Sequence, residues 1–240
     1  MQLKQSEKKL ISLTRHAIDE FGLIREGDRI CVGVSGGKDS MSLLTILAKL
    51  KRFYPIKFEL EAVTVSLGFE GFDISPIKKY CDELQIHFTL IETEIAKIVF
   101  EERKENNPCS LCANMRRGAV NNAAKRLECT SVALAHHKDD VVETGILSLF
   151  YEGRFHSFAP NTWLDRQQLN VIRPFVFVEE KQIREYVKLN NVPVVENTCP
   201  MDKTSQRKEV KDLLAQLGNG NPHIKSNLFG AIKRGLWDQS

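Results

Sequence analysis

Apolar residues follow two spacings that alternate along the chain. Short runs rich in Val, Ile and Leu are typical of buried strands, whereas longer stretches with an apolar residue every three or four positions predict helices. The expected strands are 29–34, 58–65, 88–91 and 132–135, with further extended pieces at 171–172 and 194–195. The expected helices are 6–25, 40–52, 74–84, 97–104, 111–127, 139–151, 179–190, 205–217 and 225–236.

The order of these elements predicts the fold class. Strands that alternate with helices of about 10–15 residues favour an α/β fold with a doubly wound, mostly parallel sheet. A helical C-terminal region follows from about residue 200, and no repeat or linker interrupts the chain, so we expect a single domain over 1–240. In such sheets ligands bind beyond the carboxyl ends of the strands.

Composition narrows the class of protein. The chain is 42% hydrophobic and 27% charged, as ordinary soluble proteins are. It has no run of about 18 apolar residues that could span a membrane, and its N-terminus lacks the apolar core of a signal peptide, so we expect a cytoplasmic protein. Basic residues gather at 116–126 and 201–240, where they form either contacts to RNA phosphates or solvated helix faces.

The run Ser-Gly-Gly-Lys-Asp-Ser at 35–40 follows the first expected strand and precedes an expected helix. The two glycines let the backbone approach a ligand, and the amides at the helix start, together with Lys38, favour a phosphate or pyrophosphate. Asp39 in an anion site indicates Mg²⁺ on the phosphates. The alternative is an ordinary Gly-Gly turn. The run resembles the loop of the ATP pyrophosphatases, or PP-loop proteins, which cleave ATP to AMP and pyrophosphate.

A second run, His-His-Lys-Asp-Asp at 136–140, also joins an expected strand to an expected helix and should reach the same sheet edge. Lys138 is suited to neutralising phosphate charge, and an aspartate is suited to binding Mg²⁺ or steering a proton. One aspartate could instead cap the helix, and His136 could be a packing residue.

The six cysteines fall into two groups. Three are expected to be small core residues: Cys31, Cys81 and Cys129. Cys109 and Cys112 form a C-x-x-C pair at the entry of a helix, and Cys199 lies in a distant loop. Their spacing leaves a redox dithiol, a zinc site and an iron–sulfur cluster open.

Taken together, the chain resembles the tRNA 2-thiocytidine synthetase family. The matching stretches, in the family's order, are 26–30, 35–40, 109–112 with 116–118, 135–140, 150–153, 172–174 and Cys199. Members often have a second C-x-x-C around the last ligand, whereas this chain has Glu196 at its first position. Because three ligands suffice in the family, the resemblance transfers only Cys199.

The resemblance implies three sets of site residues. A [4Fe-4S] cluster would be held by Cys109, Cys112 and Cys199, leaving one iron open to carry sulfide. ATP with Mg²⁺ would bind at Ser35, Gly36, Gly37, Lys38, Asp39, Ser40, Val65 and His137, with Lys38, Asp39, Lys138 and Asp140 as catalytic residues. The candidate tRNA contacts are Arg116, Arg117, Arg173, Arg207 and Lys208.

The implied reaction is ATP-dependent thiolation of tRNA. The C2 oxygen of an anticodon-loop cytidine, position 32 in the family, would attack the α-phosphorus of ATP, and sulfide would then replace the activated oxygen. A cysteine desulfurase is the expected sulfur donor, and a homodimer is an expected assembly.

Four other functions remain open. A tRNA lysidine synthetase shares both loops but has no use for the cysteines, and a tRNA 2-thiouridine synthetase carries N-terminal zinc-ligand pairs that this chain lacks. The others are a non-catalytic metal- and RNA-binding module and a sulfur-removing or small-thiol activity.

Overall fold

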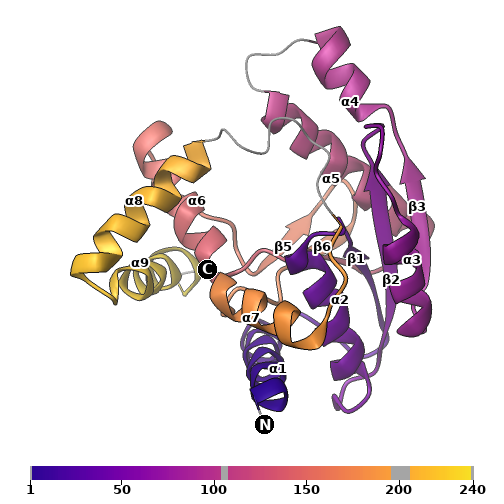
Figure 1. Ribbon diagram of the computed structural model, residues 1–240, viewed down its shortest axis with the longest axis horizontal. Helices are drawn as coiled ribbons and strands as arrows, with labels where there is room; N and C mark the ends of the chain where they lie inside the picture. Colours follow the sequence, from indigo (N-terminus) through magenta and orange to yellow (C-terminus); the bar gives the residue numbers. More distant parts are fainter. Residues whose placement is uncertain (1, 104–107, 196–205, 239–240) are drawn as a thin grey trace.

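The computed structural model describes residues 2–103, 108–195 and 206–238, with side chains from residue 5 onward. Within this part, six strands form one sheet in the order β3-β2-β1-β4-β6-β5 (Figure 1). Every neighbouring pair is parallel except the edge pair β5–β6. The predicted doubly wound, mostly parallel sheet is therefore confirmed. The strands are β1 (Asp28–Gly33), β2 (Phe58–Ser66), β3 (His87–Glu92), β4 (Ser131–Ala133), β5 (Asn161–Leu164) and β6 (Leu169–Ile172).

Helices pack on the sheet, and two further helices near the C-terminal end of the chain lie to one side of it. Figure 1 shows α8 and α9 beside α6, away from the strands β2 and β3. The helices are α1 (Gln2–Phe21), α2 (Lys38–Lys51), α3 (Ser75–Glu83), α4 (Ile95–Lys97), α5 (Pro108–Arg126), α6 (Lys138–Tyr151), α7 (Glu180–Asn190), α8 (Gln206–Gly220) and α9 (Ile224–Ile232). Two wider, π-type segments are η1 (Ile98–Arg103) and η3 (Lys233–Trp237). None of these helices is long and apolar enough to cross a membrane.

The central strand β1 is apolar because both of its faces are covered. Cys31 belongs to a core cluster with Val120 and Ala124 of α5. Its neighbours Ile30 and Val32 belong to the larger cluster on the opposite face, to which α2 contributes. Successive strand side chains point to opposite faces, so a strand buried on both sides reads as a continuous apolar run.

Three local features differ from the sequence-based expectation. The hairpin strand β5 was not expected; the turn before β6, at 165–168, contains no glycine and instead places Gln168 at a φ of 52°. The extended piece 194–195 joins no strand, but the backbone N–H of Val195 donates to the carbonyl of Gly36 at 2.9 Å. The helix expected from 111 begins earlier, at Pro108, so Cys109 lies in its first turn and Cys112 lies about one turn further along.

The sheet reverses its strand order between β1 and β4. These strands are direct neighbours, with Val32 opposite Ala133. The chain leaves β1 toward β2 on one side and leaves β4 toward β6 on the other. Such a reversal opens a crevice at the carboxyl ends of the two strands, where ligands bind in open α/β sheets. The runs 35–40 and 136–140 both begin at this crevice, as the sequence predicted.

Candidate active site

The loop after β1 presents the start of α2 without a side-chain cap. Gly36 has a φ of 81°, which L-residues rarely adopt, and Gly37 is the N-cap of α2. Because Gly37 has no side chain, the first amides of α2 are not capped by it. Unpaired amides at the positive end of a helix dipole attract phosphate groups.

The two serines of this loop hold its shape. The Ser40 hydroxyl donates to the carbonyl of Gly37 at 3.0 Å and accepts from the backbone N–H of Ser35 at 3.1 Å. The hydroxyls of Ser35 and Ser40 are also 3.1 Å apart. Since Ser40 uses its hydrogen on Gly37, Ser35 is the donor in that pair. The loop is therefore closed by its own hydrogen bonds before any ligand binds.

Lys38 and Asp39 stand at the first turn of α2. The Lys38 ammonium lies 2.8 Å from Asp39 Oδ2 and 3.0 Å from Glu180 Oε1. Burial alone would lower the pKa of Lys38, but its bonds to the two carboxylates raise that pKa above its usual value. The other carboxylate oxygen, Asp39 Oδ1, is buried and has no hydrogen-bond partner among the described residues. Such an oxygen is suited to a cation or to a ligand hydroxyl.

The run after β4 connects to this loop through His137. His137 is 4% exposed and is the N-cap of α6, where its Nδ1 accepts from the Asp140 N–H at 3.4 Å. The His137 N–H in turn donates to Asp140 Oδ2 at 2.9 Å, which completes a capping box. An accepting Nδ1 leaves the ring hydrogen on Nε2, which lies 3.9 Å from Asp39 Oδ1. The aspartate capping role considered from the sequence belongs in part to Asp140, with histidine as the N-cap.

The C-terminal helices bring basic side chains to the aspartates of α6. Arg207 of α8 lies 3.1 Å from Asp140 Oδ1. Lys225 of α9 lies 2.7 Å from Asp139 Oδ1, while Asp139 Oδ2 accepts the Glu180 N–H at 2.8 Å. Burial raises the pKa of Asp139, but the hydrogen bonds from Lys225 and from the Glu180 N–H lower it by more. The pKa of Asp139 is therefore below its usual value.

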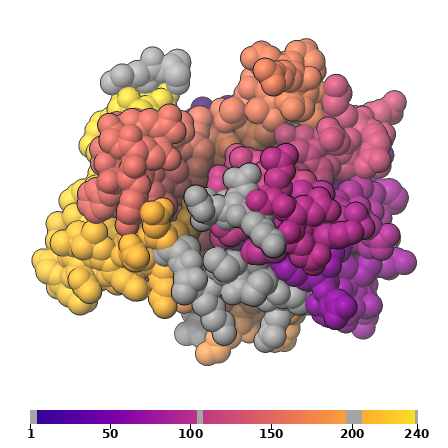
Figure 2. Space-filling view, turned by 90° about the horizontal axis from the view of Figure 1, so that it is seen from above, coloured from indigo at the N-terminus to yellow at the C-terminus, as the bar shows by residue number. Residues whose placement is uncertain are grey.

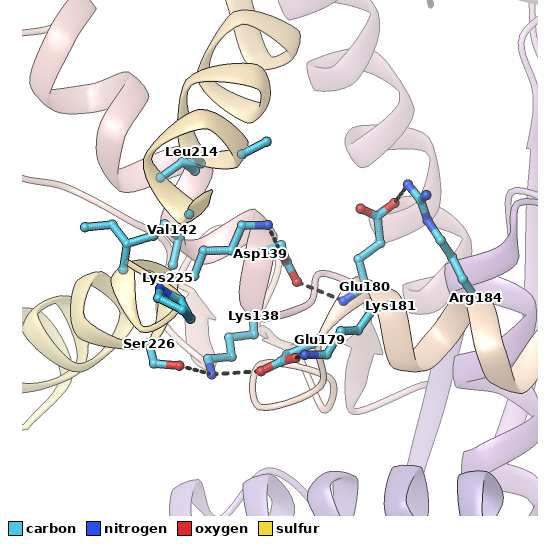
Figure 3. A pocket seen from close by; sticks show the side chains of 14 residues that line it. Lys138, Asp139, Val142, Glu179, Glu180, Lys181, Arg184, Leu214, Lys225 and Ser226 are labelled. Atoms are coloured by element: carbon cyan, nitrogen blue, oxygen red, sulfur yellow. Dashed lines mark hydrogen bonds and ion pairs between the residues drawn. The ribbon is translucent and has the colours of Figure 1, made fainter. Parts of the chain in front are cut away.

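Lys138 points into a neighbouring pocket. Its ammonium lies 3.3 Å from Glu179 Oε1 and 3.3 Å from Ser226 Oγ, and 5.4 Å from the ring centre of Phe229. The pocket has a volume of about 360 Å³ and lies between the starts of α6 and α7 and the helices α8 and α9 (Figure 3). Lys38 does not line it, so the two lysines predicted to act together are oriented toward different partners.

Two buried carboxylates of this region were not singled out from the sequence. Glu180, 8% exposed, contacts Lys38 from the first turn of α7, and Glu143, 1% exposed, lies one turn beyond Asp139 on α6. An acidic residue in the first turn of a helix is ordinary, because it complements the helix dipole. The sequence therefore carried no signal that separates Glu180 from a solvated glutamate.

Comparison with known proteins agrees with this geometry. A family model described as a PP-loop domain matches residues 3–217. The tRNA-cytidine(32) 2-sulfurtransferase of Geobacter sulfurreducens is 42% identical over 94% of this chain and 89% of its own length. That of Syntrophotalea carbinolica is 40% identical over 94% of this chain and 88% of its own. The chain belongs to the tRNA-cytidine(32) 2-sulfurtransferase family.

Solved structures share the fold of this 2-sulfurtransferase family member. The U34-tRNA thiolase NcsA from Methanococcus maripaludis, solved with its [4Fe-4S] cluster, gives a TM-score of 0.78 at 22% identity, over 97% of this chain and 79% of that one. The NH3-dependent NAD synthetase from Campylobacter jejuni gives a TM-score of 0.52 at 17% identity, over 98% and 93%. These likenesses concern the arrangement of the strands and helices.

The cysteine pair of this family member stands on the same side of the sheet as the phosphate loop. Because α5 connects the carboxyl end of β3 to the amino end of β4, its first turn lies at the carboxyl edge (Figure 1). Cys109, in that turn, is exposed, and Cys112, about one turn further along, is half-buried. Cys199 lies outside the described residues, and the described residues contain no group of three His, Cys, Asp or Glu side chains that could hold a metal. The three cysteines predicted to be core residues are buried, as expected: Cys31, Cys81 and Cys129.

The predicted tRNA contacts fall into two environments. Arg116 and Arg117 are exposed on α5, and Arg207 and Lys208 are exposed at the start of α8. Figure 2 shows α8 on the side of the molecule opposite α4, with α6 next to it. Arg173 is different, because it is 9% exposed and donates to the carbonyl of Ala159 at 2.6 Å. Burial lowers its pKa to about 10.

Two residues discussed in the sequence analysis remain: Val65, an expected ATP contact, and His136, which was considered as a packing residue. Val65 stands near the carboxyl end of β2, the strand next to β1, where it packs, partly buried, against the core cluster that contains Cys31. The ring centre of His136 lies 4.8 Å from that of Phe158, with the two rings tilted by 34°, and burial lowers the pKa of His136 to about 4. A neutral, half-buried ring against an aromatic neighbour is typical of a packing residue, the alternative considered for His136 from the sequence.

Proposed function

We propose that this protein is an ATP-dependent tRNA thiolase that converts an anticodon-loop cytidine, at position 32, into 2-thiocytidine. The observation that carries the proposal is the junction of the two loops. Lys38, Asp39, His137 and Asp140 come together at the crevice between β1 and β4, on the sheet edge where α5 begins with its cysteine pair. A phosphate site and a pair of thiols on one edge suit a reaction that joins ATP cleavage to sulfur chemistry.

In this proposal ATP lies along the junction, from the start of α2 toward β2. Its phosphates would lie over the uncapped start of α2, with the Lys38 ammonium beside them, and its base would lie toward Val65. Mg²⁺ would be held by Asp39, whose buried Oδ1 has no hydrogen-bond partner among the described residues. The ion would neutralise phosphate charge at that place. Asp140 is engaged by the His137 N–H and by Arg207, so it serves the site by fixing His137.

The chemistry proceeds in two displacements. The C2 oxygen of the cytidine attacks the α-phosphorus, the bond from this phosphorus to the bridging oxygen breaks, and pyrophosphate leaves. Lys38 and the first amides of α2 stabilise the charge that develops on the phosphates. A sulfur nucleophile then forms a bond to C2, and AMP leaves with the original oxygen. The cytidine must leave its stack to reach the crevice, which is easiest for a base in a loop.

The part of the site that binds sulfur would be formed by three cysteines. Cys109 and Cys112 lie one turn apart at the start of α5, and thiolate ligands are favoured at a helix N-terminus. With Cys199 as the third ligand they would hold a [4Fe-4S] cluster, which supplies an iron with an open position for sulfur when it is bound. A sulfur donor such as a cysteine desulfurase, a homodimeric assembly and a single catalytic domain over 1–240 belong to the same proposal.

The experiment is an analysis of metal and product on one preparation. Protein purified without oxygen should show visible absorption and contain iron rather than zinc, and with ATP, Mg²⁺, sulfide and unmodified tRNA it should form 2-thiocytidine, detected by mass spectrometry of tRNA nucleosides. Omission of ATP should abolish the product. A colourless zinc protein, or attachment of lysine to the tRNA when free lysine replaces sulfide in a parallel reaction, would overturn the proposal.

A further inference from the structure

Glu180 gathers three cations from three helices. Its Oε1 lies 3.0 Å from the Lys38 ammonium of α2 and 2.8 Å from the Arg184 guanidinium of α7, and its Oε2 lies 2.9 Å from the Lys211 ammonium of α8. Burial would raise the pKa of Glu180, but Arg184, Lys211 and Lys38 together hold it far below the usual value. The carboxylate is therefore ionised whenever the protein is folded near neutral pH.

The backbone of Glu180 is fixed independently of these ion pairs. Its N–H donates to Asp139 Oδ2 at 2.8 Å, which links α7 to the run after β4 (Figure 3). The N–H of the preceding residue, Glu179, donates to Gln182 Oε1 at 2.9 Å, so the first turn of α7 is closed by a capping box. A carboxylate on a fixed turn with only 11% of its side chain exposed differs from a surface ion pair, whose partners move freely.

Lys38 depends on such a fixed partner. A lysine ammonium sits on a flexible four-carbon stem, so its position is set by what it contacts. In the described part of the chain its carboxylate partners are Asp39 and Glu180. If Asp39 were the only partner, the ammonium would be held by a single carboxylate on the adjacent residue, whose other oxygen is buried without a hydrogen-bond partner among the described residues. Glu180 holds it instead between the two acidic groups, at the start of α2.

We propose that Glu180 is the positioning residue for Lys38, which keeps the lysine ammonium at the phosphate site of the ATP-cleaving step. This inference rests on the proposed function in so far as the bound phosphates are those of ATP. A simple charge argument predicts the opposite effect of its removal, because loss of a negative charge near the phosphates should tighten ATP binding and leave the rate unchanged.

The test separates rate from affinity. In Glu180→Gln, which keeps the shape but not the charge, pyrophosphate release in a single turnover with ATP and tRNA should slow by about tenfold or more, which corresponds to about 1.4 kcal/mol in the barrier. The dissociation constant for ATP, measured by calorimetry, should change much less. Glu180→Asp keeps the negative charge but moves the carboxylate away from Lys38, because the side chain is shorter by one methylene group. Its rate of pyrophosphate release should therefore also be lower than that of the unaltered protein. Glu185→Gln, an exposed glutamate on the same helix, is the matched control.

A second readout needs neither ATP nor tRNA. The extent to which an amine-reactive reagent labels Lys38 at one fixed pH, measured by mass spectrometry, should rise several-fold in Glu180→Gln and stay unchanged in Glu185→Gln. This readout survives if the thiolation proposal fails, so the two failures are distinguishable. Labelling and pyrophosphate release equal to those of the unaltered protein, in a folded Glu180→Gln or Glu180→Asp variant, would overturn the inference.

Discussion

Replacing Glu143 by glutamine should make the protein more stable above neutral pH. The Glu143 side chain is on the first half of α6, is 1% exposed, and has Lys211 Nζ at 3.9 Å from its Oε1. That oxygen is buried without a hydrogen-bond partner among the described residues. Burial raises the pKa of Glu143 to about 7, against the opposing influence of Lys211. An ionised Glu143 therefore lowers the free energy of unfolding, because this carboxylate is buried in the folded protein and hydrated in the unfolded chain.

The magnitude follows from linkage. A pKa raised from 4.5 in the unfolded chain to about 7 in the folded protein corresponds to about 3 kcal/mol, at about 1.4 kcal/mol for each pKa unit. Below pH 4.5 the carboxyl is protonated in both states and contributes no difference. Between pH 4.5 and about pH 7 the unfolded chain loses its proton before the folded protein does, so the free energy of unfolding falls. Above about pH 7 the full destabilisation of about 3 kcal/mol is present.

The assay is denaturant unfolding of the unaltered protein and of Glu143→Gln at several values of pH between about 3.5 and about 8. The difference in the free energy of unfolding should be nearly constant below about pH 4 and should then grow in favour of the variant, by about 3 kcal/mol at pH 8. Hydrogen bonds of the new glutamine amide could add a constant to this difference, but that constant does not depend on pH. The test is therefore how the difference changes with pH. Parallel profiles for the two proteins would refute the reasoning, and Glu185→Gln should give such a parallel profile.

Two further substitutions test the loop and the buried arginine. Gly36→Ala should lower ATP affinity at least tenfold, measured by calorimetry, because the φ of 81° costs about 1 kcal/mol for alanine and the new Cβ would lie 3.0 Å from Val195 Cβ and 3.1 Å from Ile77 Cδ1; unchanged affinity would contradict the assigned loop geometry. Arg173→Gln should lower the free energy of unfolding by about 1–3 kcal/mol in a denaturant melt, since it removes a buried hydrogen-bonded cation; unchanged stability with weakened tRNA binding would instead favour a direct RNA contact.

Most of the sheet was predictable because its signal is local. A strand covered on both faces is a continuous apolar run, and the alternation of such runs with helical patterns fixes a parallel sheet and its ligand-binding edge. The hairpin strand β5 escaped because it is four residues long and is followed by a turn without glycine. Its pairing with β6 is a property of the folded edge rather than of the segment itself.

The site was predictable as far as it lies in sequence runs. Lys38, Asp39, His137 and Asp140 belong to two short polar runs that follow strands, so the topology brings them together. Glu180 joins them from the start of α7, which lies outside both runs, and such a partner is selected by three-dimensional packing. The orientation of Lys138 toward α9 depends in the same way on where the C-terminal helices pack.

The most direct test of the account is the formation of 2-thiocytidine by cysteine variants of the protein, loaded with iron and sulfide without oxygen. With ATP and unmodified tRNA, the unaltered protein and the core variant Cys129→Ala should form the product, and Cys199→Ala should form none. Formation of 2-thiocytidine by Cys199→Ala at the rate of the unaltered protein would contradict the central claim that three cysteines carry the sulfur chemistry beside the ATP site.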